Sequence, residues 1–153
     1  MPKIDAASLP EKKGSNYPKP FDAPCAERVR KRLGDAAGLT DFGVNLLRLP
    51  PGAWSSQRHW HRREDEFVYI VSGEVVLVTD KGETGLRAGD CAGFPKDDGD
   101  GHKLVNKSSS VAVCLEVGSR SAEDTCTYSD IDMVLDRRAG FTHKDGKPYL
   151  PGT

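Results

Sequence analysis

Apolar and polar residues between Phe42 and Val117 alternate in short runs that are separated by turn-forming residues. Such runs are typical of the strands of an all-β sandwich or barrel. No part of this stretch has the 3.6-residue period of an amphipathic helix, which disfavours a parallel α/β sheet. The pattern predicts eight strands, over residues 43–49, 57–61, 66–72, 74–79, 83–87, 90–94, 102–106 and 111–117. Eight short strands favour closure into a barrel.

The breaks between the runs carry specific turn chemistry. They are Pro50-Pro51-Gly52, Ser72-Gly73, Asp80-Lys81-Gly82, Ala88-Gly89 and the Gly- and Asp-rich stretch 97–101. Proline and glycine at these places stop a strand and allow the chain to reverse. Gly73 and Gly89 are expected to adopt positive φ angles, which glycine tolerates without steric cost.

The barrel pattern is flanked by two segments of mixed composition, so we divide the single domain into three parts. Residues 1–41 form an N-terminal arm rich in Pro, Lys, Ser and Asp, expected to lie over the domain or over a partner subunit. Within the arm, residues 25–33 fit either a short helix or an edge strand. Residues 42–118 form the barrel, and residues 119–153 form a docked C-terminal extension whose apolar cluster 131–135 adds a strand or a helical turn.

Composition narrows the classes of function. No apolar run approaches the ~20 residues of a membrane-spanning helix, so no membrane partner is expected. The 22 basic and 23 acidic residues give a net charge of -1, without a basic stripe for nucleic acid. The first residues lack the apolar core of a signal peptide, which predicts a cytoplasmic location. The four cysteines show no CxxC spacing and are expected to be small buried hydrophobes, with a zinc or disulfide role as the other interpretation.

The chemistry of the chain concentrates around His59-Trp60-His61. Side chains alternate between the faces of a strand, so His59 and His61 project to one side as a pair of potential metal ligands. Glu66 begins the next predicted strand and can lie beside this pair. Imidazole with carboxylate suits Fe, Mn, Ni, Co or Zn, so the expected cofactor is one divalent transition metal ion. His102 offers a third imidazole, but spacing alone does not place it near His59.

The order of these residues resembles the two sequence motifs of the cupin family. The first motif matches Gly52, His59, His61, Glu66 and Gly73, and the second matches Gly89, Pro95, Gly99, His102 and Asn106. The resemblance implies a double-stranded β-helix, the jelly-roll barrel of cupins. It also implies that His59, His61, Glu66 and His102 are the metal ligands, and it supplies the proximity of His102 that spacing cannot give.

Two loops and one register choice depart from a simple match. One extra residue separates Gly52 from His59, and the stretch from Pro95 to Gly99 is two residues longer than the common form. Loops tolerate insertions, so neither change affects the ligand set. Glu64, Asp65 and Glu66 are consecutive acids. We choose Glu66 because six residues separate it from Gly73, as the motif requires, and because Val68 and Ile70 then share its face. Asp65 is the alternative.

The resemblance implies more about the site than about the reaction. Three histidines and one carboxylate leave two positions open on a six-coordinate metal, so a small chelating substrate can bind. We expect a small metalloenzyme acting on a small polar or sugar-like molecule, as a dioxygenase or as an isomerase or epimerase. The alternatives are a non-catalytic binding or sensor cupin and a structural or storage role. A DNA-binding regulator is disfavoured because the arm lacks two successive amphipathic helices. A homodimer is expected from cupins of this size.

Overall fold

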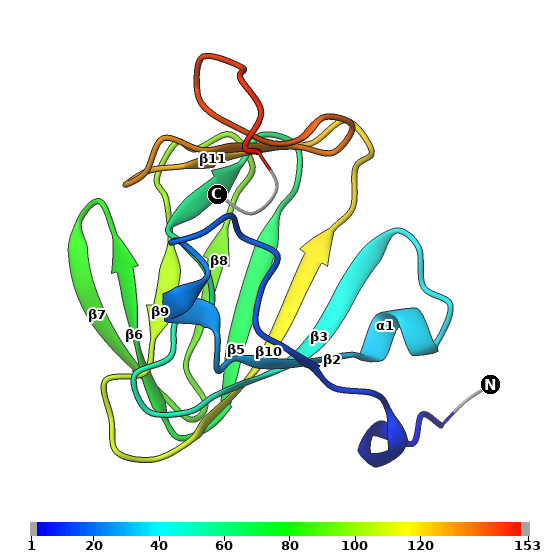
Figure 1. Cartoon of the computed structure of the whole chain (residues 1–153). Coiled ribbons are helices and arrows are strands. Elements are labelled where there is room, and N and C mark those ends of the chain that lie inside the picture. The colour runs from blue at the N-terminus through cyan, green and yellow to red at the C-terminus, as the bar shows by residue number, and fades with distance from the viewer. Residues whose placement is uncertain (1–2, 151–153) are drawn as a thin grey trace.

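The computed structural model describes residues 3–150, and its regular secondary structure is almost entirely antiparallel strand (Figure 1). The strands are β1 (Lys12–Lys13), β2 (Val29–Arg32), β3 (Phe42–Leu49), β4 (His59–His61), β5 (Glu66–Ser72), β6 (Glu74–Thr79), β7 (Gly82–Arg87), β8 (Cys91–Phe94), β9 (Lys103–Val105), β10 (Ala112–Ser119), β11 (Thr125–Tyr128), β12 (Val134–Asp136) and β13 (Gly140–Thr142). The helical elements are one short turn, α1 (Leu33–Ala36), and two 3-10 turns, η1 (Ala6–Ser8) and η2 (Ala23–Cys25). Among the residues described, no helix is long and apolar enough to cross a membrane.

One large sheet forms the first wall of the barrel, with strand order β1-β2-β3-β10-β5-β8. Strands β3 and β5 flank β10, pairing Leu47 and Ile70 with Cys114 across the sheet. These three residues are buried because the inward face of each strand carries the apolar side chains. Glu66 and Glu116 project from the same inward face, directly beyond Val68 and Cys114, the last core residues of their strands.

The opposite wall is made of two smaller sheets, β7-β6-β9 and β13-β12-β11-β4. The backbones of His59 and His102 form an isolated antiparallel bridge, with N–H···O distances of 3.2 and 2.9 Å. This bridge joins the start of β4 to the residue before β9 and therefore brings the two sequence motifs together. A second bridge, between Trp54 and Val105, supports the same junction.

The structure confirms the all-β fold class and all eight predicted barrel strands, each end within two residues of its expected place. Gly73 and Gly89 have φ angles of 75° and 95°, as expected. Of the segment 25–33, for which helix and edge strand were both open, residues 29–32 form strand β2, which pairs with β1 on one side and β3 on the other. The division of the chain at residues 41 and 118 stays a prediction, although β11, beyond residue 118, pairs with β4 inside the barrel region.

Two apolar clusters stabilise the molecule. The larger fills the barrel and contains Leu47, Leu49, Ala53, Val68, Ile70, Val75, Leu86, Leu104, Ala112 and Cys114. The smaller lies under the C-terminal strands, where Cys126, Tyr128 and Met133 pack with aromatic residues that include Tyr17 of the arm. The arm is thus anchored to the barrel by Tyr17 packing as well as by the pairing of β2 with β3.

Gly73 occupies a turn that no larger residue fits. A Cβ added there would lie 2.7 Å from the backbone oxygen of Val111, at a φ of +75°. We expect Gly73→Ala to reduce the free energy of unfolding by at least about 2 kcal/mol, from backbone strain and the clash together. Gly85→Ala is the control, because Gly85 has open space around it and no positive φ. Urea unfolding of both variants measures the difference, and equal stabilities would contradict the assigned turn.

Candidate metal centre

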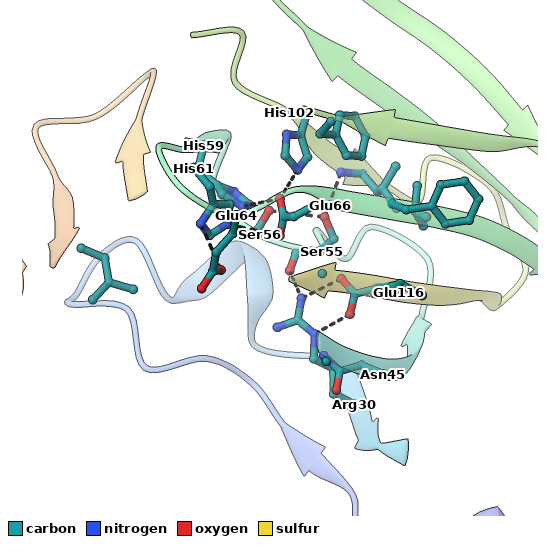
Figure 2. Close-up of a pocket in the computed structure, with 18 of the residues that line it drawn as sticks. Arg30, Asn45, Ser55, Ser56, His59, His61, Glu64, Glu66, His102 and Glu116 are labelled. Atoms are coloured by element: carbon teal, nitrogen blue, oxygen red, sulfur yellow. Dashed lines mark hydrogen bonds and ion pairs between the residues drawn. The ribbon is translucent and has the colours of Figure 1, made fainter. Parts of the chain in front are cut away.

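The four residues expected as ligands lie together on the inner surface of the barrel (Figure 2). His59 and His61 are the first and last residues of β4, which is held between β11 and the His102 bridge. Glu66 begins β5 on the facing sheet. Trp60, between the two histidines, projects to the opposite side of β4, as strand alternation requires.

The three imidazoles direct their Nε2 atoms at the carboxylate of Glu66. The distances are 3.4 Å from His59 Nε2 to Glu66 Oε2, 3.2 Å from His61 Nε2 to Glu66 Oε1, and 2.7 Å from His102 Nε2 to Glu66 Oε2. Suitable ligand atoms of His59, Glu66 and His102 lie within 4.8 Å of one another. All three imidazoles therefore approach one carboxylate, and those of His59 and His102 share with Glu66 a space the size of a metal coordination sphere.

The opposite ring nitrogens fix the orientation of two of these imidazoles. His59 Nδ1 lies 2.8 Å from the backbone oxygen of Gln57, and His61 Nδ1 lies 2.6 Å from Asp124 Oδ2. Both acceptors require a proton on Nδ1, so in the neutral ring that a metal requires the lone pair is on Nε2, the nitrogen that faces Glu66. This pattern of outer hydrogen bonds is typical of histidines that bind metal. The ring of His102 is oriented differently, by stacking on Phe94 with 3.6 Å between ring centroids.

One buried carboxylate oxygen supports the fit of a cation. Glu66 Oε2 is buried and, among residues 3–150, finds no hydrogen-bond donor of good geometry, despite its approach to His102. A buried charged oxygen without such a bond is costly, and a metal ion satisfies it. A neutral imidazole set with one carboxylate matches Fe, Mn, Ni, Co or Zn, so the residues present fit a divalent transition metal.

The electrostatics of the site favour positive charge at its centre. Burial alone lowers the pKa of His61, but the hydrogen bonds and charges of Glu66 and Asp124 outweigh it and raise the pKa to about 9. Burial opposes ionisation of Glu66, yet the surrounding histidines hold its pKa well below the usual range. Burial lowers the pKa of His102. Glu66 is therefore ionised, and the raised pKa of His61 makes protons compete with a metal at that ring.

Proton competition predicts how metal affinity depends on pH. Metal binding needs neutral imidazoles, and the raised pKa of His61 keeps that ring protonated below about pH 9 without bound metal. We expect the apparent affinity to rise with pH up to that region and to fall steadily below it. Competition with a chelator of known affinity, followed from pH 5.5 to 9, measures the trend. A flat profile would rule out direct histidine ligation.

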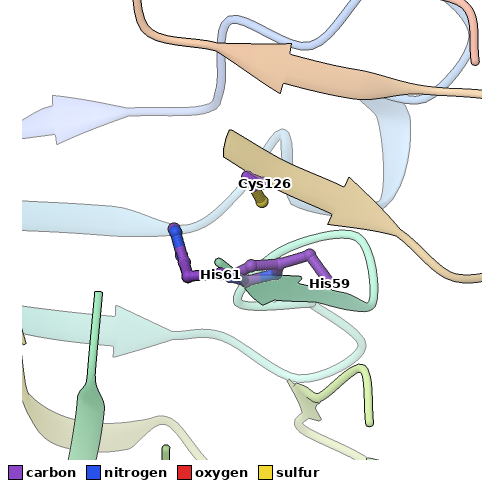
Figure 3. A group of neighbouring side chains, drawn as sticks. All are labelled: His59, His61 and Cys126. Atoms are coloured by element: carbon purple, nitrogen blue, oxygen red, sulfur yellow. The ribbon is translucent and has the colours of Figure 1, made fainter. Parts of the chain in front are cut away.

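Two other groupings of ligand-type atoms share these histidines. His59 and His61 lie near Cys126 (Figure 3), but burial raises the pKa of the Cys126 thiol, which disfavours the thiolate that a metal requires. His61 also lies near Glu64 and Asp124. The Glu64 carboxylate is already held by Arg137, with distances of 2.7 and 2.8 Å to Nη2. The grouping around Glu66 therefore fits a metal best.

The consecutive acids separate clearly in the structure. The Asp65 carboxylate accepts a hydrogen bond from the backbone of Lys96 at 2.9 Å and faces away from the imidazoles. Glu66, not the alternative Asp65, lies with the histidines.

The four cysteines are free, and three of them, Cys25, Cys114 and Cys126, are buried as expected. Cys91 is exposed because it lies on the outward face of β8 at the sheet edge.

Several site residues come from segments that gave no signal in the sequence. Asp124, which is almost completely buried and binds His61, also accepts the backbone N–H of Arg63 at 2.8 Å. It directly precedes β11, in a stretch whose composition looks like an exposed loop. Tyr128 packs against His59 with ring centroids 5.8 Å apart. The C-terminal extension therefore completes the site rather than only covering the barrel.

A cavity of about 420 Å³ opens over the four residues. Its lining includes Glu64, Glu66 and Glu116 among the acids and, among the basic residues, Lys12, Arg28, Arg30, Arg32, Arg120 and Arg137. The size suits a small polar molecule, and the excess of cations suits one that carries negative charge.

Comparison with solved structures identifies the family. The chain is 47% identical to a protein of Silicibacter pomeroyi described as a sugar phosphate isomerase from a cupin superfamily, with a TM-score of 0.92 and 98% of each chain covered. This chain belongs to the cupin superfamily. A cupin domain model matches residues 45–118. The sequence-based assignment to the cupins is thereby confirmed.

Other solved cupins are more distant. A protein of Acidithiobacillus ferrooxidans, provisionally named a sugar phosphate isomerase, is 31% identical with a TM-score of 0.76, covering 91% of this chain and 90% of its own. A predicted oxalate decarboxylase of Thermotoga maritima is 21% identical with a TM-score of 0.63, covering 78% of this cupin and 99% of its own chain, and shows the shared fold alone. No curated protein sequence matches the chain.

Proposed function

We propose that this cupin is a metal-dependent isomerase of a small sugar-like molecule that carries adjacent carbonyl and hydroxyl groups. The observation that carries the proposal is the approach of three imidazole Nε2 atoms to the Glu66 carboxylate at the wall of a cavity of about 420 Å³. Two similar solved structures bear the name of a sugar phosphate isomerase, in one case provisionally, which adds support for this reaction class. His59, His61, Glu66 and His102 would hold the metal.

Isomerisation of a hydroxy-aldehyde to a hydroxy-ketone moves a proton between two neighbouring carbons. When bound, the metal supplies Lewis-acid polarisation of the substrate oxygens. The proton needs a carboxylate that is not a ligand and is open to the cavity. Glu116 meets this need, because its side chain is 25% exposed whereas that of Glu64 is 6% exposed. Arg30 holds Glu116 in place through bonds of 2.8 and 3.1 Å.

Proton exchange with solvent tests this proposal directly. The metal-loaded protein is incubated in D₂O with a panel of aldose and ketose phosphates, and NMR follows deuterium at the carbon beside the carbonyl. We expect exchange and isomerisation with at least one compound, lost in Glu116→Gln while bound metal is retained. Oxygen uptake is monitored in parallel. Oxygen consumption without exchange would favour a dioxygenase, and binding without either reaction would favour a sensor or binding cupin.

The homodimer and the cytoplasmic location stay predictions. One face of the large sheet allows the homodimer to be tested. Phe67, Tyr69 and Val71 form an outward row on β5, with side chains between 41% and 49% exposed. An apolar row of this kind is typical of a surface that pairs with a second copy. We expect Tyr69→Glu to convert a dimer to monomers in light scattering, whereas Thr84→Glu on exposed β7 leaves it intact. A native monomer would refute the prediction.

A further inference from the structure

Four basic side chains gather on one face at the edge of the large sheet, where the arm joins the barrel. Arg28, Arg30 and Arg32 alternate along β2 and the residue before it, so they project to the same side. Lys12 of β1 is the cross-strand partner of Arg30 and shares that face. All four line the cavity that also contains the metal ligands.

Carboxylates neutralise only part of this cluster. Arg30 is paired with Glu116, and Arg32 lies 3.7 Å from Asp35, an acid that Arg120 also binds. Within residues 3–150, no carboxylate lies within 4.0 Å of Lys12 or Arg28. The other cavity arginine, Arg137, is occupied by Glu64. Two positive charges of the cluster are therefore left without an acidic partner.

Arg28 is the more informative of these two charges because it is only 8% exposed. Its guanidinium donates to the backbone oxygens of Gly14 and Ser55 and lies over the ring of Tyr17, 5.7 Å from the centroid. Backbone dipoles and an aromatic face only partly offset a buried charge. The pKa of Lys12 is lowered, by burial and then by repulsion from Arg32, Arg28 and Arg30. The positive charge of Lys12 and Arg28 is therefore only partly offset.

The cluster and the metal ligands face one space. Arg28 and Arg30 both donate to the backbone oxygen of Ser55, and in the view of Figure 2 Ser55 lies between Arg30 and Glu66. Glu116 on β10 pairs with Val68, and Glu66 on β5 pairs with Gly118. The two glutamates are therefore diagonal neighbours on the inward face of adjacent strands. A small molecule in the cavity can therefore reach the metal site with one end and the cations with the other.

We propose that Lys12, Arg28 and Arg32 form an anion subsite that binds the phosphate group of a phosphorylated substrate. The inference rests on the proposed function for the nature of the substrate. A phosphate monoester carries a charge of about -1.5 to -2 at pH 7, which matches the two cations without a carboxylate partner, Lys12 and Arg28. The N-terminal arm, by supplying Lys12, contributes directly to substrate selection.

Inorganic phosphate is the probe that tests the subsite. Isothermal titration of the metal-loaded protein compares Lys12→Ala/Arg32→Ala with Lys13→Ala/Arg48→Ala. The second pair removes the same charge from the face of the sheet turned away from the cavity. Lys13 and Arg48 are both cross-strand partners of Val29, whose side chain alternates with those of Arg28 and Arg30. We expect phosphate affinity to fall at least tenfold in the first double variant and to change less than twofold in the second. Equal losses in both would overturn the subsite.

Three further results separate the subsite from the metal and from the reaction. Phosphate affinity is expected to persist in His59→Ala/His61→Ala, and its loss there would assign the phosphate to the metal and overturn the proposal. Phosphate binding as expected, but no deuterium exchange with any sugar, would leave the subsite standing and refute the isomerase. Exchange with phosphorylated and unphosphorylated sugars at equal kcat/KM would refute the subsite and leave the isomerase standing.

Discussion

Alanine in place of His102 is expected to lower metal affinity at least about a hundredfold. Replacing an outer residue that only orients a ligand costs ten- to a hundredfold, so removing a ligand atom itself should cost more. His102 Nε2 makes the shortest of the three approaches to Glu66, at 2.7 Å. Competition with a chelator of known affinity measures the change.

His143→Ala is the matched control for this variant. His143 lies in the polar C-terminal segment and pairs with exposed Asp132 at 2.9 Å, away from the cavity. Its replacement is expected to leave metal affinity unchanged. Unchanged stoichiometry and affinity in the His102→Ala protein would remove His102 from the ligand set.

The second large effect is expected at Asp124, which touches the site only through His61. Asp124→Asn keeps the size of the side chain and can keep the bond to the backbone of Arg63, but it loses the charge beside His61 Nδ1. We expect metal affinity to fall ten- to a hundredfold while the fold is retained. Chelator competition and circular dichroism measure the two properties on the same sample.

The chain contains a second aspartate–histidine pair that serves as the control. Asp132→Asn removes the charge beside His143 Nδ1 in the same way, at an exposed position. Its metal affinity should equal that of the native protein. If Asp124→Asn also binds metal as tightly as the native protein, the orienting role of Asp124 is wrong.

The barrel strands could be predicted because their signals are local. Alternation along 66–72 and the turn residues Ser72-Gly73 fix a strand and its end without knowledge of its neighbours. The pairing of His59 and His61 on one face follows from strand geometry in the same way. The proximity of His102 does not, because it depends on the backbone bridge to His59 across 43 residues of chain. Only the family resemblance supplied it.

The outer part of the site could not be predicted because it comes from the flanking segments. Asp124 stands in a short polar stretch, and its burial depends on β11 pairing with β4, which no local pattern indicates. The same holds for the arm. The segment 25–33 allowed an edge strand, but the role of Arg28, Arg30 and Arg32 depends on the pairing of β2 with β3, which turns these side chains toward the cavity.

The central claim is that one transition metal ion is bound by His59, His61, Glu66 and His102. Its most direct test is elemental analysis of the native protein beside His59→Ala/His61→Ala, both purified without added metal and without a histidine tag. The account predicts close to one equivalent of a divalent transition metal in the native protein and little in the variant. A native protein that holds no metal, even after controlled reloading, would contradict it.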